Sequence, residues 1–282
     1  MTVSKELRRS RTKYRPRIAH PRCRFFAPLR NLSRKSNLAC PMATQIKVFP
    51  DVASIAQNAA ELIVESATEA ISRDGRFSIA LSGGHTPEAL YTLLAGEPYC
   101  SKIDWSKVEI FFGDERCVPP DSPQSNYGMA RRTMLNRVPI PPDHVHRLRA
   151  EIDPEAAAKE YGQMLKEKFG DGGLDLVLLG MGDDGHTASL FPGTEAVHEL
   201  HHRCVANHVP KLNAWRITLT APFINRSRCV SILVAGADKS SRLTQVLEGP
   251  RDPEKLPIQL IAPENGQLLW LIDVAAAGMR GE

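Results

Sequence analysis

The chain has 282 residues, a length that suits one large α/β domain or two small ones. Hydrophobic residues make up 42% of it and charged residues 24%, as in ordinary globular enzymes, and no window approaches 18 uninterrupted apolar residues, which excludes a transmembrane helix. The net charge of +4 averages two unlike parts of the chain.

The basic charge is concentrated at the N-terminus. Residues 1–41 hold 12 of the 36 Lys and Arg residues and one acid, Glu6, which gives this segment a net charge of +11. Residues 42–282 hold the other 24 basic and 31 acidic residues, for a net charge of −7. A mildly acidic body argues against nucleic acid as its main ligand.

Three interpretations of the basic segment stay open. Translation starts at Met42, or residues 1–41 are an organellar transit peptide, or they are a basic arm for nucleic acid or a membrane. In each case we expect a disordered extension without a catalytic role, followed by a single domain over residues 42–282. None of the six cysteines forms a C-x-x-C pair and no secretory signal peptide is visible, so we expect a cytoplasmic protein, with organellar targeting by residues 1–41 as the alternative.

From Ile46 onward, strand and helix patterns alternate. Short apolar runs predict strands at residues 46–49, 77–81, 108–112, 145–148, 174–179, 204–207, 217–220, 230–234 and 268–272. Apolar spacing and capping residues predict helices at 52–72, 87–94, 125–135, 153–169 and 239–247. This alternation predicts an α/β, Rossmann-like three-layer fold with a mostly parallel central sheet. Ligands of such sheets bind beyond the carboxyl ends of the strands, so motifs that directly follow a strand are the most informative.

The first such motif is Ser-Gly-Gly-His-Thr-Pro at residues 82–87. Gly83 and Gly84 let the backbone approach a ligand closely, and the helix that follows offers unpaired N–H groups and a positive dipole end. The motif therefore predicts a phosphate cradle, with a plain tight turn as the structural alternative. It matches neither the dinucleotide-binding nor the Walker A glycine pattern, so no nucleotide is implied.

The second motif, Phe-Phe-Gly-Asp-Glu-Arg at residues 111–116, also follows an apolar run. Asp114 and Arg116 are either a structural ion pair on a loop or functional groups. In the functional interpretation Asp114 orients a sugar hydroxyl or a catalytic base, and Arg116 holds negative charge. Their position directly after a buried strand favours function.

The third motif is Gly-Met-Gly-Asp-Asp-Gly-His-Thr-Ala-Ser-Leu-Phe-Pro at residues 180–192, after the apolar run 174–179. Asp183 and Asp184 precede His186 by three and two residues, on a loop whose glycines permit an unusual backbone path. Imidazole titrates near neutral pH, so a histidine beside a carboxylate at a strand end predicts a general base.

Together these motifs carry a family resemblance. The ordered segments are SGGHTP at 82–87, FFGDERCVP at 111–119, SNYGMA at 125–130, GMGDDGHTASLFPG at 180–193, WRITLT at 215–220 and VAGADK at 234–239. From about Ile46 to Asp273 the chain resembles the glucosamine-6-phosphate isomerase/6-phosphogluconolactonase family, on the lactonase side. His85 departs from it, because the family usually has a small hydroxyl residue there.

The resemblance implies hydrolysis of 6-phospho-D-glucono-1,5-lactone to 6-phospho-D-gluconate in the oxidative pentose phosphate pathway, without metal or organic cofactor. His186 would activate water. Either Asp114 or Asp184 would orient the imidazole, and Arg116 with backbone N–H groups of residues 180–185 would hold the oxyanion. The residues expected to bind the substrate or its phosphate are Ser82, Gly83, Gly84, His85, Thr86, Asn126, Gly182, Arg216 and Lys239.

Other functions compete with lactone hydrolysis. A deaminase-like isomerase acting on glucosamine-6-phosphate would carry Asn-Glu-Pro after the histidine, whereas here no acid follows His186 before Glu195. A non-catalytic sugar-phosphate sensor would not need His186, its neighbouring acids and Arg116 together. Ser82 lacks the G-x-S-x-G context of a nucleophile, and the remaining histidines lack matching carboxylates or cysteines for a metal. We expect a small-molecule sugar phosphate lactone as the partner, no nucleic acid, no membrane, and a monomer or weak homodimer.

Overall fold

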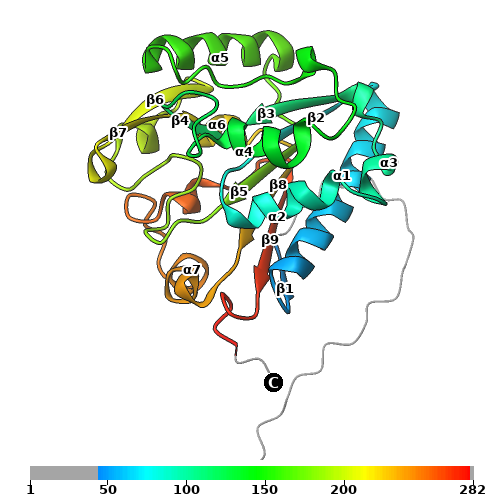
Figure 1. Ribbon diagram of the computed structural model, residues 1–282. Coiled ribbons are helices and arrows are strands. Elements are labelled where there is room, and N and C mark those ends of the chain that lie inside the picture. The colour runs from blue at the N-terminus through cyan, green and yellow to red at the C-terminus, as the bar shows by residue number, and fades with distance from the viewer. Residues whose placement is uncertain (1–43, 280–282) are drawn as a thin grey trace, which may run out of the picture. The chain divides into compact units, whose positions relative to one another are not determined.

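A six-stranded sheet organises residues 44–279, the part of the chain that the computed structural model describes (Figure 1). Its strands lie in the order β1-β9-β8-β5-β2-β3, and all neighbours run parallel. Their bounds are β1 Gln45–Phe49, β2 Phe77–Leu81, β3 Val108–Phe112, β5 Leu176–Gly180, β8 Cys229–Val234 and β9 Gln267–Asp273. The predicted α/β fold with a mostly parallel central sheet is confirmed. The basic segment 1–41 lies outside the described residues.

Seven α-helices are found in residues 44–279: α1 Val52–Asp74, α2 His85–Leu94, α3 Tyr99–Lys102, α4 Asn126–Ala130, α5 Pro154–Phe169, α6 Ala221–Ile224 and α7 Ser240–Glu248. The longest follow their sequence signals. Asp51 caps α1 by accepting the Ser54 N–H at 2.8 Å, and Asp153 caps α5 by accepting that of Ala156 at 2.9 Å. No helix in this part of the chain is both long and apolar enough to cross a membrane.

A second, three-stranded antiparallel sheet lies beside the first, in the order β4-β7-β6. Its strands are β4 Asp114–Arg116, β6 Cys204–Val209 and β7 Ala214–Leu219. The expectation of a loop at Asp114–Arg116 is therefore wrong. Gly113 links the two sheets, because its N–H donates to Leu81 of β2 and its carbonyl accepts from Leu219 of β7.

The strand expected at residues 145–148 is also corrected. Only Val145 pairs, as an isolated bridge to Ile110 of β3. The His146 N–H donates to the Ile110 carbonyl at 2.8 Å, so the segment covers the outer edge of β3 without extending the sheet.

The strand order places a switch point at the middle of the large sheet. From β2 the chain moves outward to β3, then returns to β5 on the other side of β2 and continues outward through β8 and β9. Strands β2 and β8 are buried along their whole length, so their sequences are continuously apolar or small. Loops that leave the carboxyl ends of β2 and β5 diverge at this point, which is where such sheets bind ligands.

Candidate active site

A cavity of about 370 Å³ opens at the carboxyl ends of β2 and β5. Its walls come from the loops after these two strands, from β4 and β7 of the small sheet, and from the turn between β6 and β7. The predicted site residues that line it are Ser82, Gly83, Gly84, Asp114, Arg116, Asn126, Gly182, Asp184, His186 and Arg216. The side chains of His85, Thr86 and Lys239 are not part of this lining.

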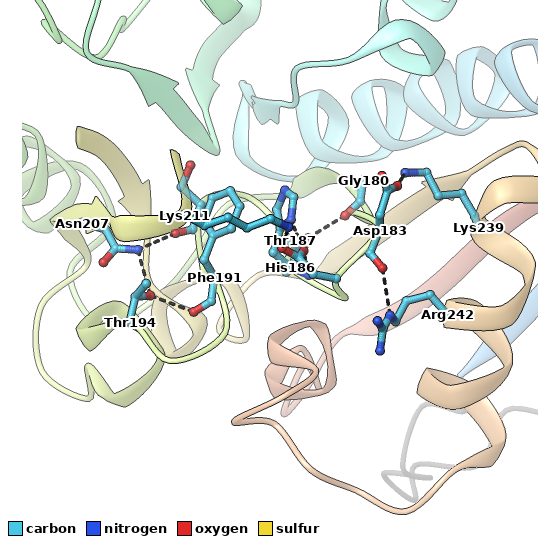
Figure 2. Close-up of polar contacts among 12 residues, drawn as sticks. Gly180, Asp183, His186, Thr187, Phe191, Thr194, Asn207, Lys211, Lys239 and Arg242 are labelled. Carbon is cyan, nitrogen blue, oxygen red and sulfur yellow. Dashed lines mark hydrogen bonds and ion pairs between the residues drawn. The ribbon is translucent and has the colours of Figure 1, made fainter. Parts of the chain in front are cut away.

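The imidazole of His186 is held on three sides. Its Nδ1 lies 2.6 Å from Oδ1 of Asp184, and its ring stacks on Phe191 with centroids 4.0 Å apart. On its other side is Gly182, where a Cβ atom would overlap the ring. Figure 2 shows the imidazole beside Phe191. Nε2 makes no hydrogen bond to any described residue, so it is the ring nitrogen left for chemistry in the cavity.

Asp184 is the carboxylate that contacts His186, which answers a question that the sequence left open. Its Oδ1 accepts from the imidazole, and its Oδ2 accepts from Nζ of Lys211 at 3.0 Å. The hydrogen bond from His186 is the main reason that the pKa of Asp184 is well below its usual range; burial opposes this, and Lys211 adds to the lowering. An ionised Asp184 favours the tautomer that has its proton on Nδ1, which leaves the lone pair of Nε2 available in the cavity.

Asp114 contacts a different set of side chains from Asp184. Its side chain is buried, its Oδ2 accepts the Ser189 hydroxyl at 2.6 Å, and its Oδ1 accepts the Asn126 amide at 3.1 Å. The same Asn126 amide also donates to the Asp114 backbone carbonyl at 2.9 Å. Asp114 therefore fixes Asn126 and Ser189, two of the neutral polar residues that line the cavity, and does not contact the imidazole.

Glu115 is a structural residue that the sequence reasoning did not single out. Its buried carboxylate accepts the backbone N–H groups of Asn126 and Tyr127, each at 2.8 Å, and the Ser125 hydroxyl at 2.9 Å. It thus anchors the N-terminus of α4 to β4. Burial raises the pKa of Glu115, and these hydrogen bonds oppose the rise. Asn126 is held so close to Gly83 that any Cβ there would overlap its amide.

The cations of the cavity come from the small sheet. Arg116 of β4 and Arg216 of β7 are direct neighbours in the antiparallel register. The Arg116 guanidinium donates to the backbone carbonyl of Gln124, whereas Arg216, which is half-buried, has no hydrogen-bond acceptor among the described residues. Burial is the main reason that the pKa of Arg216 is lowered, and Arg116 adds to it. The carboxylates of Asp114 and Glu115 lie near enough to oppose this lowering, but within residues 44–279 neither guanidinium forms an ion pair with a carboxylate. Two adjacent guanidiniums of this kind are suited to an anionic ligand.

The glycine loop presents backbone to the cavity. Gly84 precedes α2, whose first turn has no side-chain cap, so N–H groups at this end are free for an anion. Tyr91 braces the loop: its hydroxyl accepts the Ser82 N–H at 2.9 Å and donates to the Ser82 carbonyl at 2.8 Å. The His85 side chain is fully exposed and lies 3.8 Å from Glu88, so it faces away from the site.

Lys239 ends a short 3-10 turn directly before α7 and is linked to the cavity through Asp183, which lines it. Its Nζ forms an ion pair with Asp183, and the Asp183 carbonyl accepts Nε of Arg242 at 2.9 Å (Figure 2). Sequence reasoning did not single out Lys211, although a lysine in the turn before the Arg216 strand was a usable signal. Within residues 44–279, no three His, Cys, Asp or Glu side chains are grouped to hold a metal ion.

Most of the chain is similar to proteins of one known family. Residues 50–270 match the model of the Glucosamine-6-phosphate isomerases/6-phosphogluconolactonase family. A 6-phosphogluconolactonase from Nostoc sp. is 42% identical over 83% of this chain and 98% of its own length. A probable chloroplastic 6-phosphogluconolactonase 3 from Oryza sativa is 35% identical over 82% of this chain and 75% of its own.

Solved structures of 6-phosphogluconolactonases are also similar to this chain. The 6-phosphogluconolactonase from Trypanosoma brucei superposes with a TM-score of 0.74 at 30% identity, covering 84% of this chain and 98% of that one. The residues that the family model matches, 50–270, include both motif-bearing loops of the cavity and all three strands of the small sheet. The chain belongs to the glucosamine-6-phosphate isomerase/6-phosphogluconolactonase family.

Proposed function

We propose that this protein hydrolyses 6-phospho-D-glucono-1,5-lactone to 6-phospho-D-gluconate, a step of the oxidative pentose phosphate pathway. The observation that carries the proposal is the His186–Asp184 pair, which leaves one imidazole nitrogen free in a cavity that two guanidiniums without an ion-pair partner among the described residues also line. The 42% identity to a 6-phosphogluconolactonase over nearly all of that relative supports the choice of substrate.

The reaction begins with water. Nε2 of His186 takes a proton as the water oxygen bonds to C1 of the lactone, and the carbonyl electron pair moves to the carbonyl oxygen. When the carbonyl re-forms, the bond between C1 and the ring oxygen breaks, and the ring oxygen takes the proton back from Nε2. The opened acid then loses its proton to solvent. A lactone is an activated ester, so water suffices as the nucleophile.

Asp184 and Lys211 act through His186. Asp184 stabilises the imidazolium that forms in the first step, and its second oxygen is neutralised by Lys211. This is the arrangement of a positioned base, because the acceptor of the Nδ1 proton cannot turn away without losing the lysine. Asp114 contributes indirectly, by holding Ser189 and Asn126 toward the substrate.

The developing oxyanion needs donors. In the turn after β5, the N–H of Gly182 already bonds to the His186 carbonyl at 2.9 Å, and that of Gly185 to the Gly182 carbonyl at 3.0 Å. These two are therefore engaged, and Arg116 is the side chain best suited to the oxyanion. Arg216, the N–H groups at the start of α2 and Lys239 are assigned to the phosphate.

Deamination of glucosamine-6-phosphate is the alternative reaction. After His186 the chain continues with Thr187, which donates to the Gly180 carbonyl at 2.8 Å, and Ser189, which donates to Asp114. Neither supplies an acid for ring opening at this place. The purified protein should open the phosphorylated lactone and release no ammonia from glucosamine-6-phosphate. Ammonia release without lactone hydrolysis would reverse the assignment, and binding without turnover would favour a sensor.

We also propose a cytoplasmic monomer or weak homodimer that uses neither nucleic acid nor a membrane. The net charge of −7 on residues 42–282 supports this for the body. Organellar import by residues 1–41 is the competing route, since one relative from Oryza sativa is named chloroplastic. Fluorescent fusions with and without residues 1–41 would separate the two: the same diffuse pattern for both supports the cytoplasm, and a change on removal supports import.

A further inference from the structure

The two acids of the turn after β5 are paired with two different lysines. Asp184 is bound on both oxygens, by His186 and by Lys211. Asp183 binds Lys239 alone: among the described residues, no other group donates to its carboxylate. Asp184 is thus fixed from two sides, and Asp183 is fixed only by the cation that it neutralises.

Burial separates the two members of the Asp183–Lys239 pair. The side chain of Lys239 is 21% exposed, whereas that of Asp183 is 76% exposed. The Asp183 backbone is held by Arg242, which donates to its carbonyl at 2.9 Å. The lysine is therefore a fixed partner, and the aspartate carboxylate can rotate into solvent without a change of the backbone. The hydrogen bond from Lys239 is the main cause of the lowered pKa of Asp183, so the carboxylate is charged at neutral pH.

We propose that Asp183 is an internal counter-ion of Lys239 that a phosphate monoester must displace, so that Asp183 sets the affinity of the site for phosphate. This inference rests on the proposed function, which assigns Lys239 to the phosphate. A phosphate dianion carries more charge and more acceptor oxygens than one carboxylate. It therefore binds Lys239 more strongly than Asp183 does and displaces the Asp183 carboxylate. A ligand that carries a single negative charge competes less well with Asp183 for Lys239, so the site binds it more weakly than a phosphate dianion.

The cost of this displacement is small but measurable. An exposed ion pair contributes little to stability, and binding must break only one, so removing Asp183 should tighten phosphate binding about two- to five-fold. Once displaced, the Asp183 carboxylate remains near the phosphate and repels it, which also weakens phosphate binding. Asp183 thus lowers affinity and speeds release of the phosphorylated product.

Asp238 offers a matched control. Its carboxylate lies 3.6 Å from the same lysine nitrogen, is 68% exposed, and is not part of the cavity lining. The substitution Asp238→Asn removes the same charge from the same neighbourhood without removing the hydrogen-bonded competitor. A general gain of positive potential would therefore affect both variants alike.

The experiment measures the Kd of inorganic phosphate for the full-length protein by calorimetry, with Kd from competitive inhibition of lactone hydrolysis as the second readout. Asp183→Asn should tighten binding about two- to five-fold and Asp238→Asn by less than half as much. In a Lys239→Ala background, Asp183→Asn should lose its effect.

Weaker binding in Asp183→Asn, equal tightening in both variants, or an effect that persists without Lys239 would each overturn the inference. These outcomes leave the proposed function standing as long as the parent hydrolyses the phosphorylated lactone. Failure of the parent to turn over the lactone would instead remove the proposed function.

Discussion

The two sheets supply different halves of the site. The parallel sheet ends in the glycine loop after β2 and in the turn with Asp184 and His186 after β5. The antiparallel sheet and its turn supply the cations Arg116, Arg216 and Lys211. Side chains from the parallel sheet are clamped by neighbours, whereas Arg216 has no acceptor among the described residues. In the proposed reaction His186 with Asp184 serves the chemistry and Arg216 serves substrate binding, so substitutions at these two places should have different kinetic signatures.

The largest effect is expected on the parallel side. Replacing His186 by Ala removes the base and should lower kcat about 10²–10⁴-fold, since that is the usual contribution of a positioned general base. Lactone hydrolysis measured near neutral pH, with spontaneous opening subtracted, tests this. His85→Ser is the control, because that imidazole is fully exposed and lies against Glu88. A larger loss of kcat in His85→Ser than in His186→Ala would show that the base lies on the loop after β2 and not on the loop after β5.

On the antiparallel side the loss should fall on binding. Arg216→Ala should raise KM about ten- to a hundred-fold with a smaller change in kcat, because a charge-assisted contact to phosphate is lost. Comparison with unphosphorylated gluconolactone sharpens the test, since that substrate should be poor for the parent and scarcely worse for the variant. Equal losses on both substrates would show that Arg216 serves the chemistry instead.

A moderate effect is expected for stability in acid. The pKa of Asp184 is lowered in the folded protein from its ordinary value of 3.8, so the unfolded chain binds more protons there. The stabilising contribution is complete above that unfolded value and is lost as pH falls through the folded-state pKa. The Tm difference between the parent and Asp184→Asn should therefore shrink as the pH falls below about 4. A difference that stays the same or grows below about pH 4 would contradict the Asp184–His186–Lys211 arrangement.

The smallest effect is expected outside both sheets. A chain that begins at Met42 should retain full kcat, KM and Tm, because every candidate site residue lies within residues 44–279. A clear drop in Tm would show that residues 1–41 stabilise the rest of the protein.

The sequence predicts the strands of the parallel sheet and β6 and β7 of the antiparallel sheet, but it misses β4. Runs such as Phe77–Leu81 and Cys229–Val234 are buried along their whole length, so hydrophobicity alone reveals them. Strand β4 has only three residues, two of them acidic, and owes its conformation to pairing with β7 far along the chain. No local pattern encodes such a pairing.

The same limit applies to the site. Strand-end glycines, His186 and the nearby acids were predictable, because they follow an apolar run directly. The choice between Asp114 and Asp184 was not, since it depends on which carboxylate the loop turns to the ring. Two further features depend on side-chain geometry that sequence spacing does not contain. The His85 side chain is fully exposed, and Lys211 contacts Asp184 from a turn that lies 25 residues after His186 in the chain.

The clamp around His186 has a consequence for the path of the proton. With Phe191 stacked on the ring, Gly182 close against it and Asp184 bonded to Nδ1, the imidazole is held against turning over and exchanging its nitrogens. In the proposed reaction one atom, Nε2, must therefore both accept the proton of water and return it to the ring oxygen. Attack and departure then take place on the same side of the sugar, within reach of a single nitrogen. The protein needs no second acid, and the lactone must enter with that edge of its ring turned to Nε2.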